Sequence, residues 1–265
     1  MELPAGIEKI LIQCADFIYM LLPRSLPGPD KLKACKIVSH RGEHDNTNVY
    51  ENTIAAFDSA LEQGVWGIEF DVRWTRDLQP VVAHDPDLKR VFGIETTIAE
   101  VEFDELRSQC PQVPLLSEVI ERYGRKMHFM IELKEEVYPD PARQNAIFKD
   151  CFVSLQPRKE YHLMTLAPDM FDLITFAPPS SFIPIAMLNI PSFSKLALEK
   201  NYRGVAGHYL LLTSAILEKH RQNGQRVGTG YPASKNCLLR EVNRGVEWIF
   251  SNNAGDLMKI INRLI

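Results

Sequence analysis

The sequence predicts one α/β domain over residues 1–265, folded as a parallel (β/α)8 barrel of the TIM type. Short β-branched runs alternate with amphipathic helical stretches along the chain, which is typical of a parallel sheet with crossover helices. Eight such alternations can be counted, the number that closes this barrel. Several histidines and acidic residues end these runs, where barrel enzymes gather their catalytic groups. At 265 residues the chain is near the upper size of one domain.

An extra helix is expected before the barrel. Apolar residues between Ile7 and Leu22 recur at helical spacing, and polar residues such as Glu8 and Asp16 interrupt the segment as a membrane span. We predict that this helix, 7–22, covers one end of the barrel or forms an oligomer contact. The alternative is a peripheral helix lying on a membrane surface. The Pro-rich stretch that ends at residue 30 then forms a loop before the first strand.

The eight strands of the barrel are predicted from the β-branched and apolar runs. They lie at 36–41, 67–73, 127–133, 162–167, 182–188, 203–208, 226–230 and 247–251. Helical stretches between them include 52–64, 114–124, 192–202, 214–224 and 235–245. Several of these stretches end in a glycine suited to a helix C-terminus.

A ninth apolar run, 80–85, does not fit the regular alternation. The turn that precedes it is too short for a parallel crossover, so the run is predicted to form a hairpin with 67–73. Residues from about 86 to 113 then form a small insertion after the second strand, with a short helix around Val101 to Ser108. Such a loop on the catalytic face could wall the pocket.

Composition excludes several classes of function. Hydrophobic residues make up 45% and charged residues 24%, as in ordinary globular proteins, and the net charge is −4. Lys and Arg are scattered, so we expect no nucleic-acid partner. Five widely spaced cysteines without a metal-binding pattern, and no basic stretch before the N-terminal apolar run, favour a cytoplasmic location. Association with a membrane through 7–22 is the alternative location, and the oligomeric state is left open.

Three carboxylates are candidate ligands of a divalent cation. Glu69 and Asp71 are two residues apart, so on a strand they point to the same face. Glu132 lies on the next barrel strand, and Lys134, two residues later, points to the same face as Glu132. Hard oxygen ligands of this kind suit Mg²⁺ or Ca²⁺. Glu69 and Asp71 alone could equally be a solvated face or an ion pair with Arg73. Together with Glu132 and Lys134 on a further strand, they are costly to bury without a metal or an anion to organise them.

Two histidines stand where acid–base catalysts are expected. His40 ends the first strand and precedes Arg41 and Gly42, and His84 ends the run 80–85. A single histidine at a strand end is most often structural, but two imidazoles beside a cation can act as general base and general acid. Arg41 and Lys134 supply positive charge for a phosphodiester substrate. This set of residues indicates a metal-dependent phosphodiesterase.

The ordered motifs are similar to those of the glycerophosphodiester phosphodiesterase family. They are His40-Arg41-Gly42, Glu51-Asn52-Thr53, Glu69-Phe70-Asp71-Val72, His84-Asp85 and Glu132-Leu133-Lys134. The stretch VPLLSEVI at 113–120 also resembles a segment of the family. The resemblance implies a barrel that hydrolyses glycerophosphodiesters to sn-glycerol 3-phosphate and an alcohol. It implies His40 and His84 as the acid/base pair, one cation on Glu69, Asp71 and Glu132, and phosphate contacts from Arg41 and Lys134. A cyclic intermediate formed by the substrate's own hydroxyl is a compatible route.

Other positions are secondary candidates or departures from the family pattern. Glu51 and Asn52 are expected to contact the site, although Asn52 could instead cap the following helix, and His208 is expected near the pocket. Gly230 stands where the family often has an aromatic residue, and Asn252 where it has Asp. These departures point to an altered substrate shape. They keep two alternatives open: lysophospholipase D-type cleavage of lysophospholipids, and a catalytically silent barrel that binds a ligand.

Overall fold

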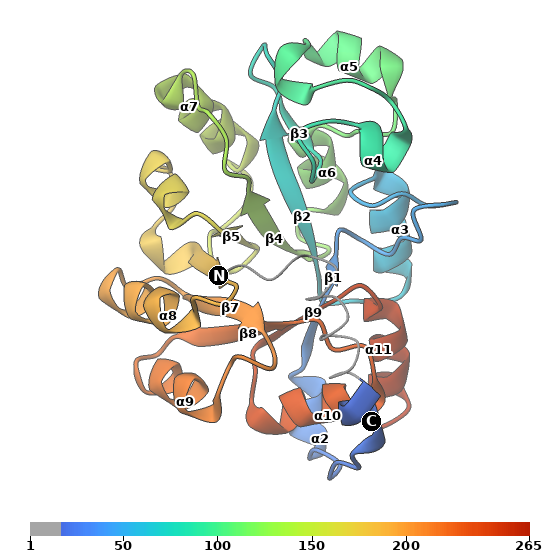
Figure 1. Ribbon diagram of the computed structural model, residues 1–265, viewed down its shortest axis with the longest axis vertical. Coiled ribbons are helices and arrows are strands. Elements are labelled where there is room, and N and C mark those ends of the chain that lie inside the picture. Colours follow the sequence, from blue (N-terminus) through green and yellow to red (C-terminus); the bar gives the residue numbers. More distant parts are fainter. Residues whose placement is uncertain (1–16) are drawn as a thin grey trace.

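A closed barrel is confirmed by a computed structural model, which describes residues 17–265. The strands are β1 (Lys36–His40), β2 (Gly67–Trp74), β3 (Pro80–Val82), β4 (His128–Leu133), β5 (Tyr161–Thr165), β6 (Phe182–Ala186), β7 (Gly204–His208), β8 (Arg226–Gly230) and β9 (Trp248–Ser251). All pairings are parallel except that of β3 with β2 (Figure 1). The barrel closes because β1 pairs with both β2 and β9.

Helices surround the barrel and connect successive strands. They are α2 (Pro29–Lys33), α3 (Ile54–Glu62), α4 (Lys89–Phe92), α5 (Phe103–Gln109), α6 (Leu116–Tyr123), α7 (Pro141–Cys151), α8 (Ile190–Glu199), α9 (Ser214–Gln222), α10 (Lys235–Arg244) and α11 (Ala254–Asn262). The link from β5 to β6 consists instead of two 3-10 segments, Pro168–Leu173 and Pro179–Ser181. Each segment begins with a proline, which cannot lie in the interior of a regular α-helix because it lacks the backbone N–H.

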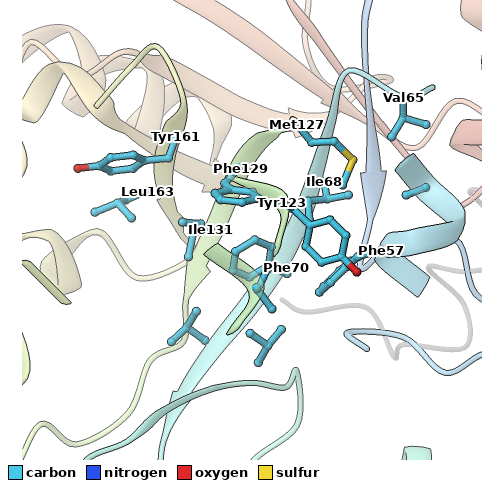
Figure 2. Packing of buried hydrophobic residues seen from close by; sticks show 14 of the residues in the cluster. Phe57, Val65, Ile68, Phe70, Tyr123, Met127, Phe129, Ile131, Tyr161 and Leu163 are labelled. Carbon is cyan, nitrogen blue, oxygen red and sulfur yellow. The ribbon is translucent and has the colours of Figure 1, made fainter. Parts of the chain in front are cut away.

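The alternation of side chains on β2 and β4 separates the core from the site. Ile68 and Phe70 of β2 point outward with Phe129 and Ile131 of β4, and they pack against the surrounding helices (Figure 2). A smaller cluster fills the barrel interior, and it includes Val38, Met130, Met164, Ile183, Ala206, Trp248 and Phe250. Because successive strand residues face opposite sides, the acidic residues between the outward apolar ones face inward.

The predicted hairpin forms, and the segment after it packs on its own small core. Val72, Arg73 and Trp74 pair antiparallel with residues of β3. Within 86–113 lie α4 and α5 and a 3-10 turn, Ile98–Glu100, held by a separate apolar cluster that includes Leu88, Ile98 and Leu106. The expected strand 80–85 ends earlier, at Val82, so His84 lies in a loop two residues beyond it. The expected strand 182–188 also ends early, at Ala186.

The helix expected at 7–22 lies outside the described residues except for its last six. Residues 17–21 are helical. The Tyr19 ring meets the edge of Tyr209 with centroids 5.7 Å apart, and Asn236 at the start of α10 donates a hydrogen bond to the Met20 carbonyl. This part of the segment therefore lies against the β7–α9 loop and α10. Among the described helices, none has the length and hydropathy that crossing a bilayer would require.

Candidate active site

The candidate residues gather at the carboxyl ends of the barrel strands. His40 is the last residue of β1 and lies opposite Glu69 of β2, while Asp71 lies opposite Glu132 of β4. A cavity of about 350 Å³ opens here, and the sequence-predicted residues His40, Arg41, Glu69, His84, Glu132 and Lys134 line it. Residues separated by more than ninety positions in the chain are thus brought to one pocket, as expected of barrel enzymes.

Three buried carboxylates lie together at the pocket, and two of them, Glu69 and Glu132, line it. Ligand oxygens of Glu69, Asp71 and Glu132 all lie within 4.8 Å of one another. Burial and the neighbouring carboxylates raise the pKa values of Glu69 and Glu132. Burial also opposes ionisation of Asp71, but Lys134 and Arg41 outweigh it and hold the pKa of Asp71 below its usual range. The crowding of negative charge is a cost that a cation would relieve.

The donor set suits a hard divalent cation. Glu69 Oε1 is buried and accepts no hydrogen bond from the described residues, so it can offer a lone pair to an ion. All three donors are carboxylate oxygens, which Mg²⁺ and Ca²⁺ prefer, and the cavity leaves space for water or substrate oxygens. The residues present therefore fit such an ion.

Two cations stand beside the carboxylates. Lys134 Nζ lies 2.7 Å from Asp71 Oδ1, and Arg41 Nε lies 3.3 Å from Asp71 Oδ2. Arg41 adopts a left-handed backbone, with φ of 58°, and its backbone N–H donates to the Glu69 carbonyl. Gly42 follows with φ of 77°, and a Cβ there would lie 2.7 Å from the Ala56 side chain. The turn thus needs glycine at position 42 to direct Arg41 into the pocket.

The two histidines have different hydrogen-bond partners. His40 Nδ1 lies 2.6 Å from Asn252 Oδ1, and its Nε2 lies 3.7 Å from Glu69 Oε2. Burial and the charge of Arg41 lower the pKa of His40 to about 3. His84 Nδ1 lies 2.6 Å from Asp85 Oδ1, and burial lowers the pKa of His84 while Asp85 works against that shift. In each ring Nδ1 is engaged, which leaves Nε2 for proton transfer.

Glu51 and Asn52 lie behind the pocket rather than in its lining. Asn52 donates to Asp71 Oδ2 at 2.8 Å, and Thr53, not Asn52, caps α3. Glu51 is 4% exposed and accepts a hydrogen bond from Arg41 at 2.9 Å. Both residues therefore hold groups that reach the cavity. His208 does line the cavity, and burial lowers its pKa to about 4.

Arg90 of α4 was missed by sequence reasoning. Its guanidinium donates to both oxygens of Glu51, at 3.1 and 2.6 Å, and also to Asp85. Arg90 therefore links Glu51, which holds Arg41, to Asp85, which holds His84. The segment 86–113, expected to wall the pocket, contributes through this contact. No periodicity marks the residue, and its only signal is a basic residue five positions after Asp85.

Tyr231 corrects the expectation that Gly230 leaves the pocket without an aromatic wall. Both residues line the cavity, and the Tyr231 ring meets His40 edge-on with centroids 5.0 Å apart. The Tyr231 hydroxyl lies 3.4 Å from His40 Nε2. The aromatic side chain is thus supplied one residue later than the family pattern suggests, because β8 ends at Gly230 and Tyr231 turns over the barrel mouth.

Comparisons with known proteins agree with this geometry. Residues 40–181 match the sequence model of the glycerophosphoryl diester phosphodiesterase family. A glycerophosphodiester phosphodiesterase of Bacillus altitudinis is 34% identical over 42% of this chain and 50% of its own length. One from Caldanaerobacter subterraneus is 24% identical over 86% of this chain and 98% of its own. A human lysophospholipase D is 35% identical over 33% of each chain.

Solved structures show the same fold. A glycerophosphodiester phosphodiesterase of Thermotoga maritima has a TM-score of 0.69 at 22% identity, covering 85% of this chain and 98% of its own. A phosphodiesterase of Oleispira antarctica, solved in complex with the product sn-glycerol-3-phosphate, has a TM-score of 0.68 at 19% identity, covering 89% of this chain and 97% of its own.

Proposed function

The chain belongs to the glycerophosphoryl diester phosphodiesterase family, and we propose that it hydrolyses glycerophosphodiesters to sn-glycerol 3-phosphate and an alcohol. One observation carries this proposal: two histidines, two cationic side chains and the carboxylates of Glu69 and Glu132 line one cavity, and the buried Asp71 lies within reach of the same ion. Such a set contains a group for each task of phosphodiester hydrolysis, including charge stabilisation and proton transfer. The small-molecule substrate is expected to lie with its phosphate toward Arg41 and Lys134.

The carboxylates are proposed as the metal ligands. A divalent cation, Mg²⁺ or Ca²⁺, held by Glu69, Asp71 and Glu132 would polarise the phosphoryl oxygens and offset the charge of the transition state. Asn52 and Lys134 keep Asp71 oriented and ionised through their contacts with its oxygens. Arg41 is held by Glu51 so that its guanidinium remains beside the phosphate position.

The two histidines are proposed to divide proton transfer between them. His40 has an amide partner and lies beside Arg41, so its imidazolium form is disfavoured and the neutral ring can act as base. It would remove the proton of the attacking hydroxyl, from water or from the substrate itself. His84 has the Asp85 carboxylate as its partner, which stabilises the imidazolium, so His84 is the better acid for the leaving alcohol.

Product release tests this function directly. We expect wild-type protein to release sn-glycerol 3-phosphate from glycerophosphocholine or glycerophosphoethanolamine with Mg²⁺ or Ca²⁺, and to lose the activity in EDTA. Glu132→Gln should abolish turnover. Glu135→Gln, which changes an exposed carboxylate in the next loop, should leave it unchanged. If no cation supports release from either substrate, the proposal is wrong, and a silent barrel that binds a ligand becomes the better interpretation.

Lysophospholipase D-type cleavage is a second candidate. Much of the remaining cavity lining is apolar, and it includes Met164, Leu166, Ile185 and Met187. A water-soluble glycerophosphodiester offers no apolar part to this wall, whereas the acyl chain of a lysophospholipid does. Comparing kcat/KM for lysophosphatidylcholine and glycerophosphocholine decides between them. A higher value for the lysolipid would favour the second candidate.

Location belongs to the same proposal. Cys35, Cys110 and Cys151 are free thiols, which supports the predicted cytoplasmic compartment. Contact of residues 7–22 with a membrane is the alternative, and the described end of that segment exposes Phe17, Ile18 and Leu21.

A further inference from the structure

One side of the cavity mouth, above β5 to β8, carries exposed apolar side chains. Four βα loops contribute them, and together they are called the apolar rim: Leu166 after β5, Met187 and Leu188 after β6, Leu210 and Leu211 after β7, and Tyr231 after β8. Each is between 37% and 62% exposed, and each also lines the cavity. Large apolar residues scattered singly over a surface need no explanation, but a continuous group around one opening marks an interaction site.

A second exposed apolar group lies next to the rim. Phe17, Ile18 and Leu21 are 58%, 56% and 61% exposed. They are placed there by Tyr19, whose ring packs on Tyr209, the residue before Leu210 and Leu211. The apolar surface therefore extends beyond the cavity, farther than one acyl chain inside it would need.

The rim residues and their immediate neighbours in the chain carry no charge. Residues 166–168, 187–189, 209–213 and 231–234 contain no Lys, Arg, Asp or Glu. The positive charges of Arg41 and Lys134 lie instead inside the cavity, where they can contact a phosphate. This distribution is complementary to an amphiphile that presents a phosphodiester inward and its apolar part outward. It is not suited to a charged protein surface.

We propose that the apolar rim, together with Phe17, Ile18 and Leu21, docks on the surface of a zwitterionic lipid bilayer or micelle, so that substrate enters the cavity directly from the lipid phase. The proposal deepens the lysophospholipid function described above and rests on it for its biological purpose. Because the rim is uncharged, docking should come from burial of apolar side chains and not from attraction to anionic lipids.

Vesicle flotation without turnover tests the docking alone. Wild-type protein should float with phosphatidylcholine vesicles. Added phosphatidylserine and high NaCl should change the bound fraction little. Met187→Ser/Leu188→Ser/Leu211→Ser should weaken binding by roughly tenfold or more, since each substitution removes a side chain that is buried only in the docked state. Should this variant fold poorly, Phe17→Ser/Leu21→Ser tests the same surface on another element.

Val153→Ser/Ile265→Ser is the matched control. Both residues are exposed, at 83% and 58%, and neither lines the cavity, so vesicle binding should equal that of wild type. Absence of wild-type binding to phosphatidylcholine, or equal loss in rim and control variants, would overturn the proposal. So would self-association of wild type that only the rim variants abolish, because the rim would then be an interface between copies of this chain.

Hydrolysis of soluble glycerophosphocholine by wild type separates this inference from the proposed function. Turnover of that substrate without vesicle binding rejects only the docking surface. Vesicle binding without turnover of any substrate rejects only the proposed function.

Discussion

At the scale of single residues, the two histidines have different hydrogen-bond partners, on which their different proposed roles rest. Asn252 offers His40 a neutral oxygen, whereas Asp85 offers His84 a carboxylate. A carboxylate stabilises the charged imidazolium and an amide does so much less, so the two rings should differ in basicity although both are half-buried. Asn252, noted in the sequence as a departure from the family pattern, thus contacts the proposed base directly.

The division of labour between the histidines predicts a dependence on the leaving group. His40→Ala and His84→Ala should each lower kcat/KM for glycerophosphocholine by about 10²–10⁴-fold. A p-nitrophenyl leaving group needs no protonation, so His84→Ala should recover most activity on a glycerophosphodiester that carries it, while His40→Ala should not. Steady-state kinetics on both substrates measure this. Equal impairment of His84→Ala on the two substrates would exclude the assignment.

The contact between Arg90 and Glu51 predicts how stability depends on pH. Burial alone would raise the pKa of Glu51, but hydrogen bonds from Arg90 and the charge of Arg41 lower it to about 2 from 4.5. A lowered pKa stabilises the folded protein above the unfolded value, and this contribution is lost as pH falls through the folded value. Glu51→Gln should therefore reduce the free energy of unfolding at neutral pH by about 3 kcal/mol, with the difference from wild type shrinking between pH 4.5 and 2.

Urea denaturation of wild type and Glu51→Gln across that pH range checks this expectation. Glu121→Gln, at an exposed position on α6, serves as the control and should follow wild type throughout. A constant difference between Glu51→Gln and wild type at every pH would show that Glu51 does not stabilise the fold through its charge.

At the scale of elements, close contact between neighbouring strands limits which residues are tolerated. Gly204 of β7 lies opposite Arg226 of β8, and a Cβ on Gly204 would lie 1.6 Å from the Arg226 carbonyl oxygen. Backbone cannot yield as a flexible side chain can, so the two strands would have to separate. This pair lies at the start of both strands, and neither residue lines the cavity.

Gly204→Ala should therefore destabilise the protein by roughly 2 kcal/mol or more without changing a group of the site. Gly28→Ala is the control, since nothing lies within 4 Å of the Cβ it would add and its φ is −60°. Chemical denaturation of both variants measures the difference. If the two variants are equally stable, β7 and β8 can separate at this pair at little cost.

At the scale of the whole molecule, the proposed cation site predicts that cation binding is coupled to folding. An ion that binds only the native state adds about 2.7 kcal/mol at a concentration one hundredfold above its Kd. Mg²⁺ or Ca²⁺ should therefore raise the Tm of wild type, and Glu132→Gln should lose this shift because it removes one of three ligands. Differential scanning calorimetry tests it independently of activity. An unchanged wild-type Tm with every divalent cation would argue against a metal centre at these carboxylates.

The sequence by itself determined the barrel, the hairpin of residues 67–73 with the following run, and the set of polar residues at the cavity. These follow from local rules: a period of two places Glu69 and Asp71 on one face, and parallel strands bring their carboxyl ends together. Their roles as ligands and catalysts remain predictions for the experiments above.

Only the tertiary structure decided which further residues contact the polar residues of the site. Arg90 reaches Glu51 from the inserted helix α4, and Asn252 and Tyr231 reach His40 from the residues that follow β9 and β8. No periodicity in the sequence links such distant positions. The apolar rim likewise exists only because the barrel brings four separate loops to one opening. Contacts between side chains far apart in the chain depend on how the barrel closes, and the local pattern of residues carries no record of that geometry.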